Sequence, residues 1–168
     1  GDRVELSNLQ RQILHRVEDV GRPKCESARD SLTALNPHCR VKTYGVRLDA
    51  ANVRETLNSY EVVLDASDNF ETRFLVSDCC RLEQIPLISA AALGFQGQLL
   101  VVDPRRGSPC YRCLMPEPPP PGAVPTSRQV GIMGAVAGVM GCLQALEALK
   151  LLLGLESDLT RRLLSYDG

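Results

Sequence analysis

The sequence predicts an α/β fold, built on a mostly parallel sheet with helices on both of its faces. Short runs typical of strands, rich in apolar and β-branched residues, occur at residues 41–44, 62–65, 87–91 and 98–102. Helical patterns lie between the first three of these runs, and such alternation of strands and helices is typical of a parallel sheet. One run ends in Asp65, and Asp68 and Asn69 follow it. In open α/β sheets ligands bind at this carboxyl edge.

The composition indicates a globular domain. The 168 residues are 44% hydrophobic and carry a net charge of −1, so no bulk basicity suggests nucleic acid or an anionic membrane. Residues 130–153 are the most apolar stretch, but Gln144, Glu147 and Lys150 follow about 14 uninterrupted apolar residues, short of the roughly 20 that cross a bilayer. We therefore expect a buried helix there and no membrane segment.

The cysteines indicate the compartment. There are seven, an odd number, and only two of them have a motif spacing. This pattern favours free thiols in a reducing compartment over a disulfide scaffold. No signal peptide begins the chain. We expect a cytoplasmic protein.

The first elements are predicted from capping and turn residues. Ser7 and Gln10 fit a capping box for a short helix over residues 8–14. Pro23 follows a turn and is well placed as the first residue of a helix that stops near residue 35, before a proline.

The central elements follow in order. Helices are expected at residues 51–57 and 70–83, the second directly after the strand that ends at Asp65. The last two strands are joined through Gly94 and Gly97.

A long loop and a long helix complete the chain. Residues 104–126 are expected to form a loop, which contains the stiff proline run 118–121. Loops of this length in compact domains are usually functional. A helix is expected over residues 129–153, with Gly154 as its C-cap. Four glycines in its first half indicate close approach by a neighbouring helix or a partner subunit: Gly131, Gly134, Gly138 and Gly141.

Two basic residues are candidate phosphate ligands. Arg11 is expected one turn into a helix, where a guanidinium can grip a triphosphate as a fork. A solvated helix face is the more common explanation of an arginine at such a position, because arginine is mostly exposed. Lys24 lies in the first turn of its helix, where the helix dipole disfavours a cation. A lysine against this rule is a candidate phosphate ligand, unless the nearby Glu26 simply offsets its charge.

Asp68 is the candidate magnesium ligand. It stands between a strand end and a helix start, and hard oxygen ligands suit Mg²⁺ on a phosphate. The alternative is that Asp68 or Asn69 merely caps the helix.

Cys110 and Cys113 form a C-x-x-C pair before the proline-rich loop. Such a pair is half of a tetrahedral zinc site, but no second pair follows before residue 168. A redox pair or two unrelated thiols are the alternatives. The loop setting favours a metal, because a thioredoxin-like pair would open a helix.

Two familiar site types are missing from the sequence. It contains neither a G-x-G-x-x-G nor a Walker-type loop. It has two histidines but no nucleophile-elbow motif, so a serine hydrolase is not indicated.

Several stretches nevertheless occur in one order along the chain: Ser7-Asn-Leu-Gln-Arg11-Gln12, Gly21-Arg-Pro-Lys24, Asn36-Pro37, Asp65-Ala-Ser-Asp68-Asn69 with Arg73, Gly97-Gln98, Cys110-Tyr-Arg-Cys113 and Gly141-Cys-Leu-Gln144-Ala-Leu-Glu147-Ala-Leu-Lys150. Together they resemble the adenylation domain of the ubiquitin-activating superfamily, over nearly the whole chain. The similarity is greatest to the molybdopterin-synthase and thiamine-pathway adenylyltransferases and to the eukaryotic adenylyltransferase–sulfurtransferase of tRNA thiolation.

The resemblance implies a Rossmann-like fold and a reaction. ATP and Mg²⁺ would activate the C-terminal Gly-Gly carboxylate of a ubiquitin-like sulfur carrier, giving an acyl-adenylate and pyrophosphate. Arg11, Lys24 and Asp68 are implied as catalytic, with Asp68 linked to magnesium. Cys110 and Cys113 match half of a zinc tetrad. The residues implied at the nucleotide are Ser7, Asn8, Leu9, Gln10, Arg11, Lys24, Asp68 and Asn69. A homodimer is expected through the Gly131–Gly141 face or surfaces near it.

The chain departs from the family pattern in three places. The glycine-rich turn and the ribose-binding acid would precede residue 1, and the second cysteine pair would follow residue 168. Ser127 stands at the position of the family's reactive cysteine, although a helix N-cap would also explain a serine there. The expectation is a partial adenylation domain over residues 1–168, truncated at both ends and poorly active alone.

Two other functions compete with this hypothesis. A non-catalytic partner subunit of an activating enzyme fits Ser127, but Arg11, Lys24 and Asp68 argue against it. A nicotinamide-dependent dehydrogenase is weakened by the C-x-x-C pair and by the phosphate-type Lys24.

Overall fold

The structure is a computed structural model that describes residues 2–120 and 122–168. The chain divides into two compact units, Gly1–Arg47 and Leu48–Gly168. Arg11 and Lys24 belong to the first unit, and Asp68 and the cysteine pair belong to the second.

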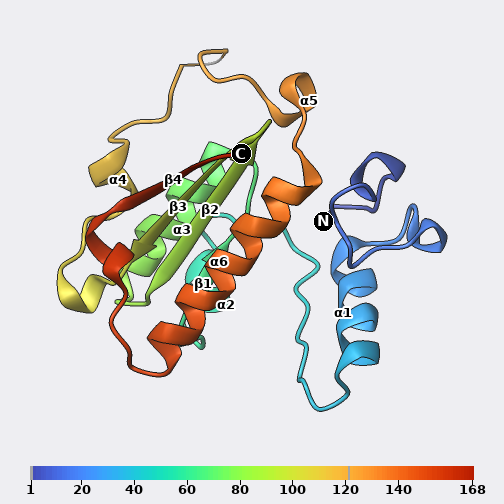
Figure 1. Cartoon of the computed structure of the whole chain (residues 1–168). Coiled ribbons are helices and arrows are strands. Elements are labelled where there is room, and N and C mark those ends of the chain that lie inside the picture. Colours follow the sequence, from blue (N-terminus) through green and yellow to red (C-terminus); the bar gives the residue numbers. More distant parts are fainter. Residues whose placement is uncertain (1, 121) are drawn as a thin grey trace. The chain divides into compact units, whose positions relative to one another are not determined.

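The first unit consists of two 3-10 turns and one helix, η1 (Leu6–Asn8), η2 (Val17–Asp19) and α1 (Lys24–Leu35) (Figure 1). The predicted end of α1 is confirmed, and Pro23 is its N-cap. The predicted helix over residues 8–14 is wrong, because only the 3-10 turn η1 forms there. The capping pair is Glu5 with Asn8 and not Ser7 with Gln10: the Asn8 Oδ1 accepts the Glu5 N–H at 3.2 Å.

Residues 41–44 were predicted as a strand, and they pair with no described strand. Their apolar and β-branched composition is therefore not sufficient to form a ladder. A strand also needs a neighbouring backbone edge with free N–H and C=O groups.

The second unit is built around one four-stranded sheet. Its strands are β1 (Val63–Asp65), β2 (Leu87–Leu93), β3 (Gln96–Val102) and β4 (Leu163–Asp167), in the order β1-β2-β3-β4. The β1–β2 pair is parallel, and the other two pairs are antiparallel. The predicted α/β class is confirmed, but the described sheet is not mostly parallel. Gly94 and Phe95 alone link β2 to β3, and so short a connection joins only antiparallel strands.

Helices cover both faces of this sheet, as predicted. One core contains Leu87, Leu100 and Val102 from the strands, packed with residues of three helices: α2 (Val53–Leu57), α3 (Phe70–Leu82) and α4 (Tyr111–Leu114). The other core contains Ile88, Leu99 and Val101, packed against α6 (Gly134–Leu152). Neighbouring strand residues thus supply opposite faces, which is the two-residue period of a pleated strand.

The predicted helix over residues 129–153 is two helices, α5 (Ser127–Val130) and α6. Gly131 ends α5 with a φ of +81°, a backbone conformation that favours glycine. No neighbouring helix approaches Gly138 or Gly141 of α6, since a Cβ at either would meet nothing within 4 Å in the described structure. Approach by a partner subunit stays a prediction. The close contact is at Gly97 of β3 instead. A Cβ there would lie 2.4 Å from the Met140 Sδ of α6.

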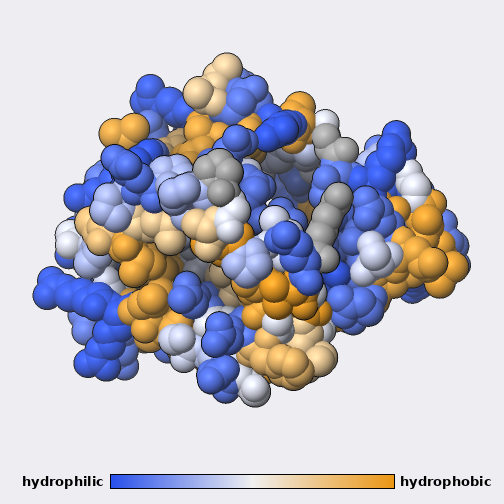
Figure 2. All heavy atoms as spheres, turned by 90° about the horizontal axis from the view of Figure 1, so that it is seen from above, coloured by the Kyte–Doolittle hydropathy of each residue, from blue (hydrophilic) through white to orange (hydrophobic). Residues whose placement is uncertain are grey.

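α6 is long and apolar enough, by length and composition alone, to cross a membrane. Its contacts indicate a helix packed by one face on a sheet. The prediction of a buried helix holds for that face alone, because only 28% of the apolar window is buried. Val136, Met140 and Ala148 pack on β2 and β3, and the buried Gln144 and Glu147 are hydrogen-bonded. The space-filling view in Figure 2 shows hydrophobic patches set among hydrophilic residues.

The region between β3 and α5 is mostly irregular, as predicted for residues 104–126. It contains two short helical elements, η3 (Pro104–Arg106) and the four-residue α4. After α6, the 3-10 turn η4 (Asp158–Arg161) leads into β4, which sequence reasoning missed.

Candidate active site

The segment that follows β1 carries the candidate magnesium ligand. β1 ends at Asp65, whose side chain is buried and therefore structural. One carboxylate oxygen of Asp65 accepts the Ser67 N–H at 2.9 Å, and the other accepts the Ser89 hydroxyl at 2.9 Å. Asp65 thus shapes the turn that leads to Asp68.

Asp68 is exposed, and its carboxylate makes no hydrogen bond or ion pair to any described residue. The helix cap is supplied by its neighbour, because the Asn69 Oδ1 accepts the Thr72 N–H at 2.9 Å. The structure therefore separates two roles that the sequence left open. Asn69 caps α3, and Asp68 keeps its carboxylate for another partner.

Sequence reasoning missed two side chains that hold this segment. Arg73 of α3 donates to the Ser67 carbonyl and, at 3.0 Å, to the Ala90 carbonyl. Gln144 of α6 donates to the carbonyls of Asp65 and Ile88. Both positions stood inside the motifs that carry the family resemblance, but no local pattern shows which backbone groups a side chain reaches.

In the first unit, Lys24 lies in the first turn of α1, as predicted. It is the first residue of the helix, a place that the sequence predicted for Pro23. Its ammonium lies 3.0 Å from the Asp2 carboxylate, and its side chain is 25% exposed against 82% for Asp2. An ion pair with so exposed a partner is weak and easily exchanged for an anionic ligand. Lys24 therefore remains a candidate phosphate ligand.

Arg11 lies in the turn after η1 and not inside a helix. Its guanidinium donates to the Ser7 carbonyl at 3.3 Å, a long contact that leaves most of its donors free. Asn8 is buried by its contact with Glu5, whereas Leu9 is half-buried and Ser7 and Gln10 are exposed. Arg11 is thus the residue of this stretch with the most donors available to a phosphate.

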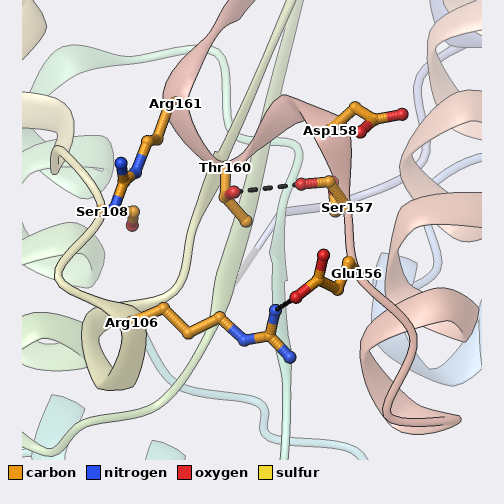
Figure 3. Close-up of a pocket in the computed structure, with 7 residues that line it drawn as sticks. All are labelled: Arg106, Ser108, Glu156, Ser157, Asp158, Thr160 and Arg161. Carbon is orange, nitrogen blue, oxygen red and sulfur yellow. Dashed lines mark hydrogen bonds and ion pairs between the residues drawn. The ribbon is translucent and has the colours of Figure 1, made fainter.

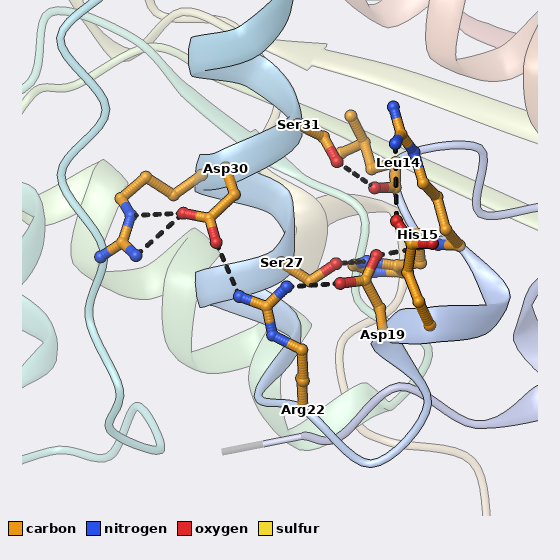
Figure 4. Close-up of polar contacts among 10 residues, drawn as sticks. Leu14, His15, Asp19, Arg22, Ser27, Asp30 and Ser31 are labelled. Atoms are coloured by element: carbon orange, nitrogen blue, oxygen red, sulfur yellow. Dashed lines mark hydrogen bonds and ion pairs between the residues drawn. The ribbon is translucent and has the colours of Figure 1, made fainter.

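A polar network ties the loop after Arg11 to α1 (Figure 4). Arg22 donates to Asp19 at 2.5 Å and to Asp30 at 2.6 Å. His15 Nδ1 lies 2.8 Å from the Ser27 hydroxyl. The Ser31 hydroxyl donates to the Leu14 carbonyl at 2.5 Å. This network fixes residues 14–22 on the helix that begins with Lys24.

The network also shifts acid–base equilibria. The backbone N–H of Arg16, with smaller contributions from Ser27 and Arg22, lowers the pKa of Asp19. The Arg22 guanidinium, with help from Arg29, lowers the pKa of Asp30. Both carboxylates are therefore held ionised beside Arg22, whose own pKa is raised, chiefly by Asp30.

Because Arg11 and Lys24 lie in Gly1–Arg47 and Asp68 lies in Leu48–Gly168, their convergence in one pocket stays a prediction. What the structure describes is two local arrangements. One presents a guanidinium and an ammonium, and the other presents a free carboxylate at the carboxyl end of a parallel strand.

The cysteine pair opens α4, with Cys110 at its N-cap. The predicted loop setting is therefore wrong, and it does not count against a redox pair. The Cys110 and Cys113 sulfurs are 3.6 Å apart, and both thiols are free. Partial burial opposes ionisation of Cys110, but hydrogen bonds from Cys113 and from the Arg112 backbone outweigh it, so the pKa of Cys110 lies below its ordinary value. Among the described residues, no group of three or more His, Cys, Asp or Glu side chains could hold a metal ion.

Ser127 is the first residue of α5, and it is not the cap. Thr126 occupies the N-cap position, and Gln129 Oε1 accepts the Thr126 N–H at 2.9 Å. The predicted capping role of Ser127 is therefore wrong by one residue. Its half-buried side chain needs another explanation.

A cavity of about 290 Å³ lies at the other end of the sheet (Figure 3). Val102 at the end of β3 pairs with Leu87 at the start of β2, so the loop that follows β3 lies at the end opposite Asp68. Arg106 binds Glu156 at 3.0 Å, and the Thr160 hydroxyl donates to the Ser157 carbonyl at 3.0 Å. Two arginines balance two acids among the residues that line it: Arg106, Ser108, Glu156, Ser157, Asp158, Thr160 and Arg161.

Comparison with known proteins places the chain. The ThiF family matches residues 1–168. A sulfur carrier protein adenylyltransferase of Thermus thermophilus is 50% identical over 171 residues, which cover 99% of this chain and 63% of the relative. Adenylyltransferase and sulfurtransferase MOCS3 of Drosophila virilis is 47% identical over 167 residues, 99% of this chain and 37% of the relative. The chain thus spans less than two thirds of either relative.

Solved structures support the fold. Escherichia coli MccB with ATP superposes with a TM-score of 0.79 at 18% identity, over 99% of this chain and 54% of that one. At this identity the likeness concerns the fold alone. The resemblance predicted from the sequence motifs is confirmed, and the chain belongs to the ThiF family.

Proposed function

We propose that this chain is the catalytic part of an adenylyltransferase. Its reaction activates the C-terminal glycine of a ubiquitin-like sulfur carrier with ATP, for sulfur transfer in molybdopterin synthesis and tRNA thiolation. The observation that carries this proposal is the 50% identity, over 99% of the chain, to a sulfur carrier protein adenylyltransferase. The free carboxylate of Asp68 and the exchangeable partner of Lys24 are consistent with it.

The reaction needs positioning and charge neutralisation more than covalent catalysis. A carboxylate oxygen of the carrier attacks the α-phosphorus of ATP and forms a new P–O bond. The bond to the bridging oxygen breaks, and pyrophosphate leaves with the electron pair. Arg11 and Lys24 would hold the negative phosphate oxygens, since guanidinium and ammonium donors make strong bonds to phosphate.

Asp68 would hold Mg²⁺. Its carboxylate is exposed and unshared among the described residues, and carboxylate oxygens are the hard ligands that this ion prefers. When bound, the ion would neutralise charge on the phosphate oxygens. Asn69 would support this by fixing the start of α3 beside Asp68.

Cys110 and Cys113 would hold a structural Zn²⁺. A tetrahedron with Zn–S bonds of about 2.3 Å has edges of about 3.8 Å, and the two sulfurs are 3.6 Å apart. The lowered pKa of Cys110 favours the thiolate that zinc requires. The pair would supply two of the four ligands.

Ser127 would leave adenylation intact and remove a covalent step. A cysteine at the family's reactive position forms a thiolate that takes up an acyl or sulfur group. A serine hydroxyl ionises far less readily and needs an adjacent base. Adenylation itself, in this proposal, depends on Arg11, Lys24 and Asp68.

A homodimer in the cytoplasm completes the proposal. The free cysteines suit a reducing compartment. Leu146, Leu149 and Leu152 of α6 are each at least half exposed and lie on one side of the helix by their spacing of three. Exposed apolar stripes of this kind are typical of contact surfaces.

The competing functions are not favoured. Both curated relatives above are named adenylyltransferases, and neither name supports a nicotinamide-dependent dehydrogenase. A non-catalytic partner subunit would not need Arg11, Lys24 and Asp68, the candidate phosphate and magnesium ligands.

Mass spectrometry of a carrier product tests the proposal. The natural protein is incubated with a ubiquitin-like carrier ending in Gly-Gly, Mg²⁺ and either ATP or NAD. We expect a carrier-adenylate with ATP only, and no adenylate when the terminal glycine is removed. A carrier that stays unmodified with ATP would contradict the proposal.

A further inference from the structure

The backbone of β1 leaves the sheet earlier than that of its neighbour. The last β1–β2 pair is Asp65 with Ser89, whereas β2 continues to Leu93. Buried backbone carbonyls beyond the last β1–β2 pair need hydrogen-bond donors from outside the ladder, because an unpaired polar group inside a protein is costly. Two side chains supply such donors at this point.

Arg73 and Gln144 reach this point from opposite faces of the sheet. Arg73 comes from α3 and is 9% exposed, and Gln144 comes from α6 and is 5% exposed. Arg73 donates to the carbonyls of Ser67 and Ala90, the latter at 3.0 Å. Gln144 donates to the carbonyls of Asp65 at 2.8 Å and Ile88 at 2.7 Å.

Each side chain therefore bridges the same two segments. One carbonyl of each pair belongs to residues 65–67, and the other belongs to β2. The Arg73 bridge lies beyond the last β1–β2 pair, and the Gln144 bridge lies at the last two pairs. We call Arg73 and Gln144 the clamp.

The clamp acts on the residues around Asp68. Ser67 is held by Arg73 at its carbonyl and by Asp65 at its N–H. Asn69 is held by its cap on α3. Asp68 lies between two fixed neighbours, and its own carboxylate is left free within the described residues.

We propose that Arg73 and Gln144 are positioning residues that set the place of the Asp68 carboxylate for adenylation. The proposal rests on the proposed function of Asp68 as the magnesium-linked acid. The clamp does not touch the nucleotide in this account. It fixes the backbone from which Asp68 reaches its ligand, and a small misplacement of such a group lowers the rate of the chemical step.

The test compares four variants in the natural protein. Arg73→Met and Gln144→Met remove the donors at similar side-chain length. Arg73→Lys keeps the positive charge and N–H donors on a single nitrogen but loses the planar fork. Arg81→Lys is the matched control, since Arg81 lies on the same helix and donates weakly, at 3.4 Å, to the Pro104 carbonyl at the other end of the sheet.

Hydrogen exchange measures, without any substrate, how firmly the clamp holds the backbone of residues 65–69. We expect the amides of residues 65–69 to exchange at least about tenfold faster in Arg73→Met and Gln144→Met. Arg73→Lys should fall between these variants and the wild type. Arg81→Lys should leave this segment unchanged.

ATP–pyrophosphate exchange in the presence of the carrier measures whether the position of the Asp68 carboxylate affects adenylation. We expect kcat to fall about 10- to 100-fold in the two methionine variants, with partial rescue in Arg73→Lys and a KM for ATP within about threefold of the wild type. A merely structural role would lower the melting temperature while leaving kcat unchanged at temperatures where the variant is folded.

Each outcome decides. Faster hydrogen exchange in residues 65–69 together with a lower kcat supports the clamp. Unchanged hydrogen exchange in both methionine variants overturns it. Faster hydrogen exchange with an unchanged kcat overturns it as well. If the wild type itself shows no pyrophosphate exchange, the proposed function fails, and with it the positioning role. Hydrogen exchange then still shows whether the clamp holds the backbone. If a methionine variant does not fold, Arg73→Lys carries the same comparison.

Discussion

Two aspartates three residues apart serve different purposes. Asp65 is buried and accepts hydrogen bonds from Ser67 and Ser89, while Asp68 is exposed and free within the described residues. Charge alone does not distinguish them, since both are acids near the end of the same strand. The distinction comes from burial and from the donors that surround each carboxylate.

The same contrast applies to the cysteines. Burial raises the pKa of Cys80 to about 12, whereas the hydrogen bonds described above lower the pKa of Cys110. Thiolates are the reactive form, so the two thiols should react at different rates.

We therefore expect Cys110 to be alkylated by iodoacetamide at neutral pH much faster than Cys80, after treatment with a chelator. Because zinc would occupy the Cys110 thiolate, added Zn²⁺ should slow labelling of Cys110 and leave the exposed Cys142 unaffected. Peptide mass spectrometry at several times measures each site. Equal labelling of Cys110 with and without zinc would count against the zinc proposal.

Gly97 is explained by a close approach. A Cβ there would lie 2.4 Å from the Met140 Sδ, and Met140 is buried. We expect Gly97→Ala to lower the free energy of unfolding by about 1–3 kcal/mol, the usual cost of overpacking a core. Gly45→Ala is the control, because a Cβ at Gly45 would meet nothing within 4 Å. Urea unfolding that gives equal stabilities for the two variants would refute this explanation.

At the scale of elements, the sequence predicted what local patterns determine. The end of α1, the start of α3 and the helices on both faces followed from proline, capping and apolar periodicity. The break between α5 and α6 did not, because an isolated glycine inside an apolar run is compatible with a continuous helix. Only the φ of Gly131 reveals the break.

Strand direction and pairing also lay outside local patterns. Residues 41–44 have strand composition but pair with no described strand, and β4 was missed although it pairs with β3. The clamp of Arg73 and Gln144 belongs to the same class, because its hydrogen bonds join residues 17 to 79 positions apart, save the one from Arg73 to Ser67. Contacts at such separations depend on tertiary structure.

The Arg22 network should make the first unit sensitive to acid. Asp19 and Asp30 have lowered pKa values, so they stabilise the fold above the ordinary carboxyl pKa of 3.8, and this stabilisation is lost as pH falls through the folded-state values. Arg22→Gln should thus have a lower free energy of unfolding than the wild type at neutral pH. This difference should shrink as the pH falls below 3.8.

Urea unfolding at neutral pH and at about pH 3 measures this difference. Arg16→Gln is the control, since its ion pair with Glu18 is long, at 3.5 Å, and largely exposed. A difference between Arg22→Gln and the wild type that stays constant over this range would contradict the assignment.

At the scale of the whole molecule, the exposed stripe on α6 leads to a prediction of assembly. If Leu146, Leu149 and Leu152 form a dimer contact, Leu149→Asp should convert a dimer to a monomer, because an unpaired charge in an apolar contact is costly. Leu82→Asp is the control, a leucine on α3 that is 79% exposed, against 56% for Leu149. Sedimentation of the natural protein at micromolar concentration measures both. A wild-type monomer would contradict the homodimer.

The nucleotide site is the remaining question at this scale. Motif order predicted its residues, and each local arrangement is consistent with a phosphate or magnesium ligand. Their predicted convergence would join residues of Gly1–Arg47 to residues of Leu48–Gly168. Neither local sequence patterns nor the separate units determine it. The central claim is therefore that Asp68 acts in the same reaction as Arg11 and Lys24.

The most direct measurement is ATP–pyrophosphate exchange by the natural protein with its carrier, in the wild type, Asp68→Asn and Asp158→Asn. Asp158 is the control, an exposed aspartate at the opposite end of the sheet. We expect Asp68→Asn to lower the exchange rate at least about 100-fold, the usual scale for losing a group that stabilises a transition state. Arg11→Met and Lys24→Met should do the same, and Asp158→Asn should stay within about twofold. An Asp68→Asn protein that exchanges as fast as the wild type would contradict the account.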